Sequence, residues 1–239
     1  MKCARKGLAM DWKRKREIRL QYDIEANGYD ELYSQEQRKK QDLAIDHLNA
    51  LDGKDRILDS GCGTGDFLAR VACNVDFAVG IDFSSKVLQR ARLKLNRISN
   101  VDLVCADFDF LPFATRAFTH IFMFTALPAP AHWSIAIRQA REALTTTGIL
   151  ILSVPKSEIS SEELVAKLKK SGLEPSELIS QRETPDYVFI GEKTPRGGGL
   201  ESTSCEGTIR VHSEHDSHLF RKAQTLLLTA GWPWGLFHI

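Results

Sequence analysis

Short apolar runs alternate with amphipathic stretches along most of the chain. Runs rich in Val, Ile, Leu and Phe predict buried strands, and five precede residue 156: one ending at Ile57 and Leu58, then Phe77–Asp82, Val101–Ala106, Thr119–Ala126 and Gly148–Val154. Between them, apolar residues recur at helical spacing. Regular alternation of strand and helix predicts a parallel, doubly wound sheet with right-handed crossovers.

Helix starts can be read from side-chain caps. Ser84 precedes a helical stretch, and Ser160 with Glu163 forms a capping box for a helix that ends at Gly172. Ser34 with Gln37 likewise predicts a helix that begins there. A further helix is expected over about Trp133–Thr146, between the fourth and fifth strands.

The last two strands are expected near Ser176–Gln181 and Tyr187–Glu192, joined through Glu183–Asp186. So short a link cannot hold a crossover helix, which makes this pair antiparallel. The predicted fold is therefore α/β, a Rossmann-like, doubly wound sheet of seven strands that is mostly parallel and ends in an antiparallel hairpin.

Charge changes this picture mainly at the N-terminus. The net charge of the 239 residues is +1, which argues against a dedicated nucleic-acid binder. Eight Lys or Arg lie between Lys2 and Arg19, against Asp11 and Glu17. We expect residues 1–20 to form a basic, solvated and partly disordered arm, with a nucleic-acid contact as the alternative.

Cysteine usage and hydropathy indicate the cellular compartment in which the protein is expected. The cysteines form no C-x-x-C pair, so neither a disulfide framework nor a zinc ribbon is expected: Cys3, Cys62, Cys73, Cys105 and Cys205. No apolar stretch of signal-peptide length opens the sequence, and no run approaches the ~20 residues that span a bilayer. A cytoplasmic protein with no membrane span is therefore expected.

A glycine-rich turn follows the first strand, where residues 56–65 read RILDSGCGTG. Glycines there let the chain turn sharply, allow a ligand to approach the backbone, and start a helix at Asp66. Dinucleotide-binding dehydrogenases use the related spacing G-x-G-x-x-G. Here the third glycine comes one residue earlier, and Asp59 stands where a dehydrogenase strand is normally apolar.

The pattern D-x-G-x-G-x-G resembles the first motif of class I S-adenosylmethionine-dependent methyltransferases, and the likeness covers about residues 20–193. It implies a methyltransferase domain over residues 21–193 with S-adenosylmethionine as cofactor. The cofactor-binding residues that it implies in this turn are Asp59, Ser60, Gly61, Cys62, Gly63 and Gly65. The sequence departs from the family at Ser60, where Val or Ile is commoner, and at 145–148, where Thr-Thr-Thr-Gly replaces Lys-Pro-Gly-Gly.

Further ligand contacts are expected at strand ends, because open α/β sheets bind ligands at the carboxyl ends of their strands. Asp82 ends the second strand, and an acid there can accept hydrogen bonds from both ribose hydroxyls. Helix capping is its alternative role, but Ser84 already supplies a cap. Phe83 is expected to lie against the adenine.

The ends of the third and fourth strands complete the predicted site. Asp107 and Phe108 match the family's second motif, in which an acid accepts from the adenine amino group and the next backbone N–H donates to the ring. Asp109 competes for this role but falls further into the loop. Thr125 is expected to line the cleft near the transferable methyl group.

Catalysis of methyl transfer requires few residues, because the sulfonium is already an activated electrophile and the protein mainly binds and aligns the reactants. A general base is needed only where the acceptor loses a proton. His132, on a loop at the ligand edge, is a weak candidate, although a packing or surface role is the simpler reading. Tyr29 is a second weak candidate, in a segment that resembles one folded over the cofactor in many small-molecule methyltransferases.

The methyl acceptor is the least defined part. An Asn/Asp-Pro-Pro-Tyr/Phe motif is missing after the fourth strand, which disfavours adenine-N6 and glutamine-amide methylation. The block over 103–154 is most similar to the ubiquinone and menaquinone biosynthesis methyltransferases, which implies a small-molecule acceptor. Residues 29–33 and 124–127 also resemble uncharacterised archaeal methyltransferases, some of whose relatives work with a small zinc-binding activator subunit. A tRNA or protein acceptor therefore stays open, as does a non-catalytic module that only binds S-adenosylmethionine.

Residues 194–239 fit none of these patterns. Pro195 and three consecutive glycines read as a linker to a tail whose role the sequence leaves undefined. His212, His215 and His218 could be drawn as a metal site, but their spacing spreads them around a helix. No metal is therefore expected.

Overall fold

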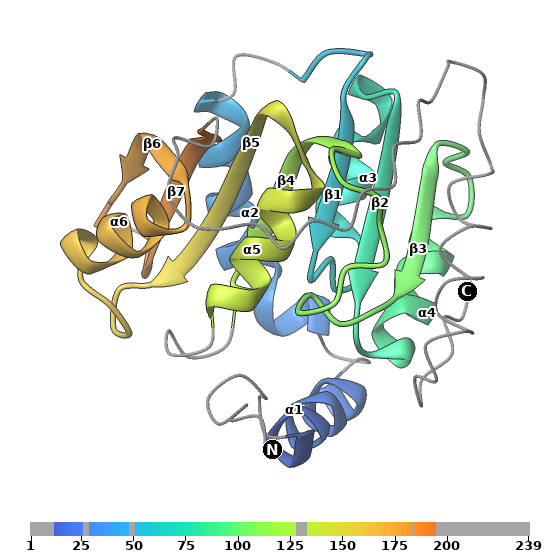
Figure 1. Ribbon diagram of the computed structural model, residues 1–239. Coiled ribbons are helices and arrows are strands. Elements are labelled where there is room, and N and C mark those ends of the chain that lie inside the picture. The colour runs from blue at the N-terminus through green and yellow to red at the C-terminus, as the bar shows by residue number, and fades with distance from the viewer. Residues whose placement is uncertain (1–11, 26–28, 48–50, 128–132, 183, 195–239) are drawn as a thin grey trace, which may run out of the picture.

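The computed structural model describes residues 12–25, 29–47, 51–127, 133–182 and 184–194. Seven strands form one sheet in the order β3-β2-β1-β4-β5-β7-β6 (Figure 1). Their bounds are β1 Arg56–Ser60, β2 Phe77–Asp82, β3 Val101–Cys105, β4 Phe118–Phe124, β5 Leu144–Pro155, β6 Leu173–Ile179 and β7 Asp186–Lys193. β1 to β5 pair in parallel, and β7 pairs antiparallel with β5 and β6, so the predicted fold class is confirmed.

Helices cover both faces of this sheet (Figure 1). Their bounds are α1 Trp12–Glu25, α2 Tyr29–His47, α3 Asp66–Val71, α4 Ser85–Leu95, α5 Trp133–Ala143 and α6 Ser161–Lys170, with a short 3₁₀ turn, η1, at Ala72–Asn74. α5 and α6 pack on one face, and α2, α3 and α4 pack on the other. α1 lies at the edge of the sheet where β2 and β3 end, and it contacts α4 (Figure 1).

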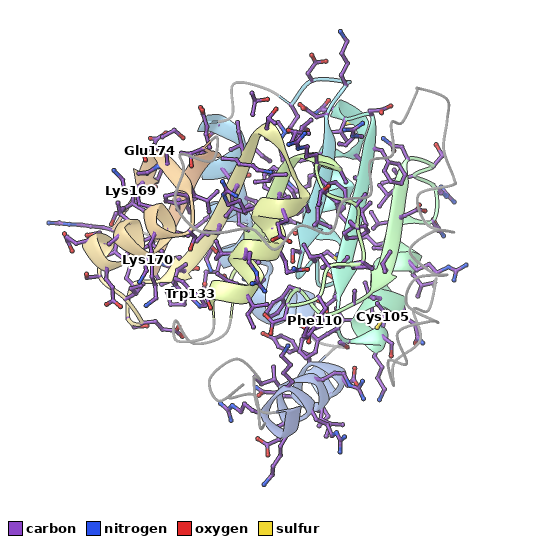
Figure 2. The ribbon with its side chains drawn as sticks, in the orientation of Figure 1. Cys105, Phe110, Trp133, Lys169, Lys170 and Glu174 are labelled. Atoms are coloured by element: carbon purple, nitrogen blue, oxygen red, sulfur yellow. The ribbon has the colours of Figure 1, made fainter. Side chains whose placement is uncertain are left out.

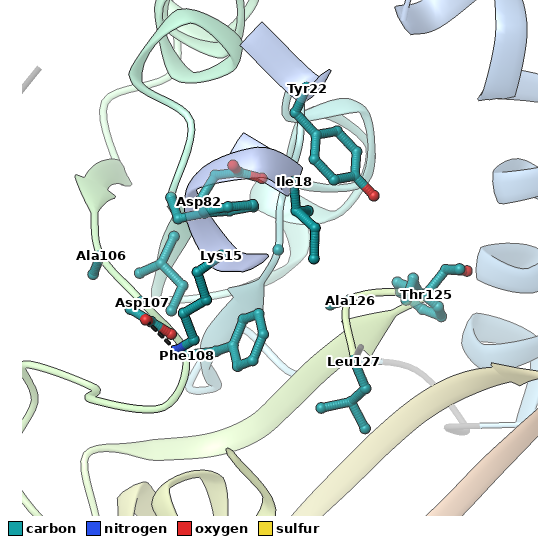
Figure 3. A pocket seen from close by; sticks show the side chains of 14 residues that line it. Lys15, Ile18, Tyr22, Asp82, Ala106, Asp107, Phe108, Thr125, Ala126 and Leu127 are labelled. Atoms are coloured by element: carbon teal, nitrogen blue, oxygen red, sulfur yellow. Dashed lines mark hydrogen bonds and ion pairs between the residues drawn. The ribbon is translucent and has the colours of Figure 1, made fainter. Parts of the chain in front are cut away.

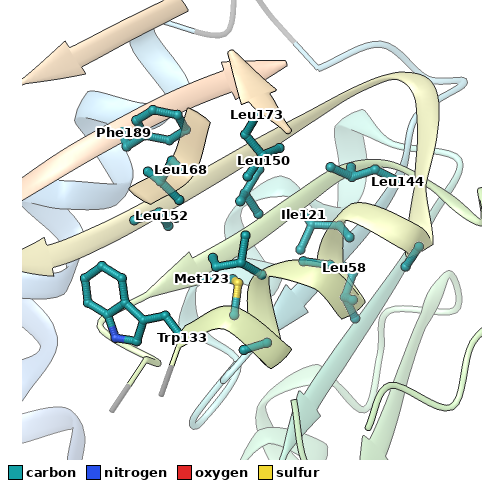
Figure 4. Close-up of a cluster of buried hydrophobic side chains, with 14 of the residues drawn as sticks. Leu58, Ile121, Met123, Trp133, Leu144, Leu150, Leu152, Leu168, Leu173 and Phe189 are labelled. Carbon is teal, nitrogen blue, oxygen red and sulfur yellow. The ribbon is translucent and has the colours of Figure 1, made fainter. Parts of the chain in front are cut away.

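The period-2 alternation of the strands divides the core between the two faces. Leu58, Ile121 and Met123 point toward α5 and belong to the cluster in Figure 4, which also holds Trp133. Ile57 and Phe122 point the other way, toward α3 and α4. Burial on both faces explains why these strands read as continuous apolar runs.

Capping side chains begin two of the helices as predicted. Ser84 Oγ accepts from the Val87 N–H at 3.2 Å, and Ser160 Oγ accepts from the Glu163 N–H at 3.2 Å. Near the other end of α6, Lys169 pairs with Glu174 of β6 at 2.9 Å, on the solvent-exposed side of the helix (Figure 2).

Some predicted boundaries were wrong. α2 begins at Tyr29 rather than at Ser34, because residues 29–33 contain no glycine or proline to stop the helix. α5 ends at Ala143 instead of Thr146, since the β-branched threonines over 145–147 favour a strand and extend β5.

Residues 12–20, the described part of the expected N-terminal arm, are helical. α1 runs through the predicted boundary at residue 20, and Lys15 on it is only 8% exposed. The division of the chain into 1–20, 21–193 and 194–239 stays a prediction.

We expect a chain that ends at Thr194 to fold as the whole chain does. All seven strands precede this point, and Thr194 itself is tied in, since its N–H donates to the Gly172 carbonyl at 3.2 Å. Thermal unfolding should stay cooperative, with a midpoint within about 5 °C of the full chain. A chain that ends at Ile179, which lacks β7 between β5 and β6, is the control and should not unfold cooperatively. Insoluble or non-cooperative protein from the longer chain would contradict the prediction.

Candidate functional site

A cavity of about 200 Å³ lies at the carboxyl ends of the central strands (Figure 3). Four segments of the domain line it, together with α1: Gly61 after β1, Ile81–Phe83 at the end of β2, Ala106–Phe108 after β3, Phe124–Leu127 at the end of β4, and Lys15, Ile18 and Tyr22 of α1. This is the edge at which open α/β sheets bind ligands. Six of the predicted cofactor residues line the cavity: Gly61, Asp82, Phe83, Asp107, Phe108 and Thr125.

Asp82 is held in place by backbone donors. Its Oδ1 accepts from the Ser84 N–H at 2.8 Å, and its Oδ2 accepts from the Gly63 N–H at 3.2 Å. Burial raises the pKa of Asp82 to about 6, although these N–H groups and that of Phe83 act to lower it. Near neutral pH the carboxylate is therefore ionised, and each oxygen keeps a lone-pair direction for a ligand hydroxyl.

The glycine turn combines two different uses of glycine. Gly61 and Gly65 have φ of 88° and 77°, which L side chains rarely adopt. A Cβ on Gly61 would lie 2.6 Å from the Ala126 Cβ, so this glycine lets the end of β4 approach the turn beside the cavity. A Cβ on Gly65 would lie 2.7 Å from a Leu95 methyl group, so the third glycine serves the packing of α3 against α4.

The remaining residues of the predicted motif do not line the cavity. Asp59 and Ser60 are buried, at 2% and 1% exposure, and Cys62 is buried beside Gly80. Burial raises the pKa of Asp59 to about 8, with a further contribution from the Asp82 charge. Asp59 is therefore mostly protonated at neutral pH, and, like Ser60, it is buried at the end of β1. The roles of Asp59, Ser60, Cys62, Gly63 and Gly65 toward the cofactor stay predictions.

α1 closes the cavity with an ion pair that the sequence analysis missed. Lys15 Nζ donates to Asp107 Oδ2 and, at 2.6 Å, to Asp109 Oδ2. Asp107 faces the cavity and Asp109 does not, in keeping with the preference for Asp107. One signal was available: Lys15, Ile18 and Tyr22 recur at helical spacing, from the basic segment to just beyond it, as the inner face of a helix does.

The two weak catalytic candidates are untested. His132 lies outside the described residues. Tyr29 is the first residue of α2, and the position of its side chain is not described. The question of a general base therefore stays open.

The described part of the chain holds neither a cluster of metal-binding side chains nor a membrane-spanning helix. Residues 12–25, 29–47, 51–127, 133–182 and 184–194 bring together no His, Cys, Asp and Glu group able to hold a metal ion. Within the same ranges no helix is both long and apolar enough to cross a bilayer. The histidines at 212, 215 and 218 lie outside them.

Comparison with known proteins identifies the domain. Residues 57–148 match the family model described as a methyltransferase domain. Residues 57–148 are thus similar to a methyltransferase domain, and the sheet has the class I methyltransferase fold. This confirms the resemblance to S-adenosylmethionine-dependent methyltransferases, and the cavity fits that cofactor, because an ionised carboxylate and a turn open at Gly61 both face it.

Solved structures share the fold at low sequence identity. A Burkholderia thailandensis 1,6-didemethyltoxoflavin-N1-methyltransferase with bound 1,6-didemethyltoxoflavin and S-adenosylhomocysteine has a TM-score of 0.66 at 15% identity, covering 79% of this chain and 92% of the other. A chain from the complex between the Haloferax volcanii Trm112 methyltransferase activator and a methyltransferase has a TM-score of 0.64 at 17% identity, covering 73% and 98%. These likenesses support the fold.

Sequence relatives share only part of their length with this chain. An uncharacterized protein of Methanocaldococcus jannaschii is 32% identical over 137 residues, 57% of this chain and 51% of the relative. The 27-O-demethylrifamycin SV methyltransferase of Amycolatopsis mediterranei is 30% identical over 169 residues, 58% of this chain and 62% of the relative. The chain thus spans about half to three fifths of the length of these two relatives.

Asp59 should make stability depend on pH. Its pKa is about 8 in the folded protein against an ordinary 3.8, so between these values the folded state holds a proton that the unfolded state releases. The free energy of unfolding should therefore fall as pH rises from 5 to 8, by at most about 1.4 kcal/mol per pH unit. Urea unfolding measured across this pH range should show that the free energy of unfolding of Asp59→Asn depends clearly less on pH than that of the wild type. Asp102→Asn, on the edge strand β3, is the control and should keep the wild-type slope; equal slopes in all three proteins would contradict the assignment.

Proposed function

We propose that this protein is an S-adenosylmethionine-dependent methyltransferase that acts on a small-molecule acceptor. The observation that carries this proposal is Asp82, an ionisable acid at the end of β2 whose carboxylate is fixed by the N–H groups of Gly63 and Ser84 and faces the cavity. Such a carboxylate suits the two hydroxyls of a ribose, because charge-assisted hydrogen bonds are short and strong.

The residues around Asp82 would hold the rest of the nucleoside. Phe83 meets Tyr22 edge to face with ring centroids 5.9 Å apart, and it offers the adenine an apolar wall. Asp107 would accept from the adenine amino group. It already accepts from Lys15 and from the Asp109 N–H, but a carboxylate has about four acceptor positions, so both can coexist with a ligand.

Methyl transfer needs few catalytic side chains. The bound cofactor supplies an activated methyl group on a sulfonium. This chain would exclude water and align the acceptor against apolar side chains. Phe124, Ala126 and Leu127 line the β4 side of the cavity, and Phe108 lines it from the loop after β3. His132 and Tyr29 remain the candidates for a base, needed only if the acceptor loses a proton on attack.

Two observations support a small acceptor. α1 lines one side of the cavity through Lys15, Ile18 and Tyr22, and the cavity volume is about 200 Å³. The named relatives and neighbours include enzymes for 27-O-demethylrifamycin SV and 1,6-didemethyltoxoflavin. A tRNA or protein acceptor, with a small activator subunit, is the second candidate, because one structural neighbour comes from a complex with a methyltransferase activator. A cytoplasmic location stays a prediction.

Replacement of Asp82 tests the cofactor assignment. Loss of two hydrogen bonds to a charged group, each worth roughly 1.5 to 3 kcal/mol, should weaken S-adenosylmethionine binding by at least about tenfold. Calorimetric titration of Asp82→Ala should show this loss, whereas the control Asp102→Ala should stay within about threefold of wild type. An unchanged affinity for Asp82→Ala would remove the ribose assignment, and tighter binding of NADH than of S-adenosylmethionine would favour a dehydrogenase.

A labelling screen tests the acceptor class. Wild-type protein and S-adenosylmethionine with a radiolabelled methyl group would be incubated with small-molecule, tRNA and protein fractions, with and without a small activator subunit. With the wild type we expect label in the small-molecule fraction. With Asp82→Ala, the control, we expect no label in that fraction. Label in tRNA or protein would support the second candidate, and tight cofactor binding with no labelled fraction would support a non-catalytic binding module.

A further inference from the structure

Thr125 has a backbone conformation that its side chain disfavours. It follows β4 directly and has a φ of 50°, in the left-handed region where a β-branched residue is an outlier. Such a conformation costs of order 1–3 kcal/mol and persists only where surrounding structure imposes it. Thr125 also lines the cavity, with Ala126 and Leu127 after it.

Polar groups from three other elements hold Thr125 in this conformation. Its N–H donates to Ser153 Oγ of β5 at 2.9 Å. Its hydroxyl donates to Asp186 Oδ2 of β7 at 3.1 Å and accepts from Lys40 Nζ of α2 at 3.0 Å. The Thr125 side chain is thus engaged by protein groups and points away from the cavity (Figure 3).

Lys40 and Asp186 form an ion pair at 2.8 Å that is almost fully removed from solvent. The side chains are 0% and 2% exposed, and Lys40 Nζ also meets Glu36 at 2.6 Å. The three donors of the ammonium group therefore have three acceptors: Glu36, Thr125 and Asp186. A buried ion pair is usually no more stabilising than apolar residues of similar volume, so its presence here calls for another use.

The conformation of Thr125 sets the position of Ala126, the next residue in the cavity wall. The Ala126 Cβ lies where a Cβ on Gly61 would be only 2.6 Å away, so the end of β4 sits tightly against the glycine turn. A rotation of the Thr125 backbone would move Ala126 and Leu127, and with them the cavity wall opposite Asp82.

We propose that Lys40 and Asp186 are positioning residues for methyl transfer. They act through Thr125, whose left-handed conformation they impose, so that residues 125–127 form the wall against which the sulfonium end of S-adenosylmethionine rests. The inference rests on the proposed function, because it assigns the Asp82 side of the cavity to the nucleoside and the β4 side to the sulfonium. Neither Lys40 nor Asp186 is among the described residues that line the cavity.

The double variant Lys40→Met/Asp186→Leu tests this role, because it replaces the ion pair by apolar side chains and keeps the packing. Its thermal midpoint should stay close to that of the wild type. Its affinity for S-adenosylmethionine should fall by about tenfold or more, because the wall that the sulfonium end contacts would shift. Its affinity for adenosine, which reaches only the Asp82 side, should change by less than about threefold.

Thr125→Val and Thr125→Ser form a matched pair, because the first removes the hydroxyl and the second removes the methyl group. Valine has nearly the shape of threonine without the hydroxyl and should reproduce the selective loss for S-adenosylmethionine. Serine keeps the hydroxyl and should bind it within about threefold of wild type. These two variants carry the test if the double variant fails to fold.

Two results would overturn the inference. Wild-type affinity for S-adenosylmethionine in the double variant and in Thr125→Val would show that the network does not position the wall, and an equal loss for adenosine would show a general structural role. Asp82→Ala separates these outcomes from a failure of the proposed function. If wild type binds S-adenosylmethionine and Asp82→Ala does not, the cofactor site stands even where the positioning role falls. If wild type does not bind it, both fall.

Discussion

The site depends on hydrogen bonds between the glycine turn and the end of the neighbouring strand. The N–H groups of Gly61 and Cys62 both donate to the Ile81 carbonyl, at 2.8 and 2.9 Å, and the Gly63 N–H donates to the Asp82 carboxylate. Buried backbone donors of a turn need partners, and here the Gly63 N–H finds one in the acid of β2 and holds it at the cavity. The turn and the carboxylate therefore form one rigid unit.

The buried carboxyl groups near the glycine turn differ in charge. Asp59 and Asp82 lie close enough that the charge of Asp82 raises the pKa of Asp59, which is consistent with one neutral and one ionised carboxyl group near pH 7. The cation among the residues that line the described cavity is Lys15, which pairs with Asp107 and Asp109. The cavity thus presents the Asp82 carboxylate as an acceptor for hydroxyl donors, while Lys15 offsets the negative charge at the β3 side.

Two ion pairs join distant segments to the cavity on opposite sides. Lys15 brings α1 over the end of β3, and Lys40 connects α2 to the end of β4 through Asp186 and Thr125. Buried ion pairs add little to stability when compared with apolar packing, but they accept few alternative geometries. This property suits a site in which the protein contributes alignment rather than reactive groups.

The sequence by itself determined the features that depend on local pattern. Alternating apolar runs and helical spacing are local, and they predicted all seven strands. Glycine spacing and the position of Asp82 predicted the ligand edge, because the carboxyl ends of parallel strands share one edge. Only the tertiary structure decided which residues meet across long separations. Lys15 and Asp107 are 92 residues apart, and Thr125 and Asp186 are 61 apart, so no local pattern relates them. The left-handed conformation of Thr125 has the same origin, since a threonine adopts it only when buried partners from other elements impose it.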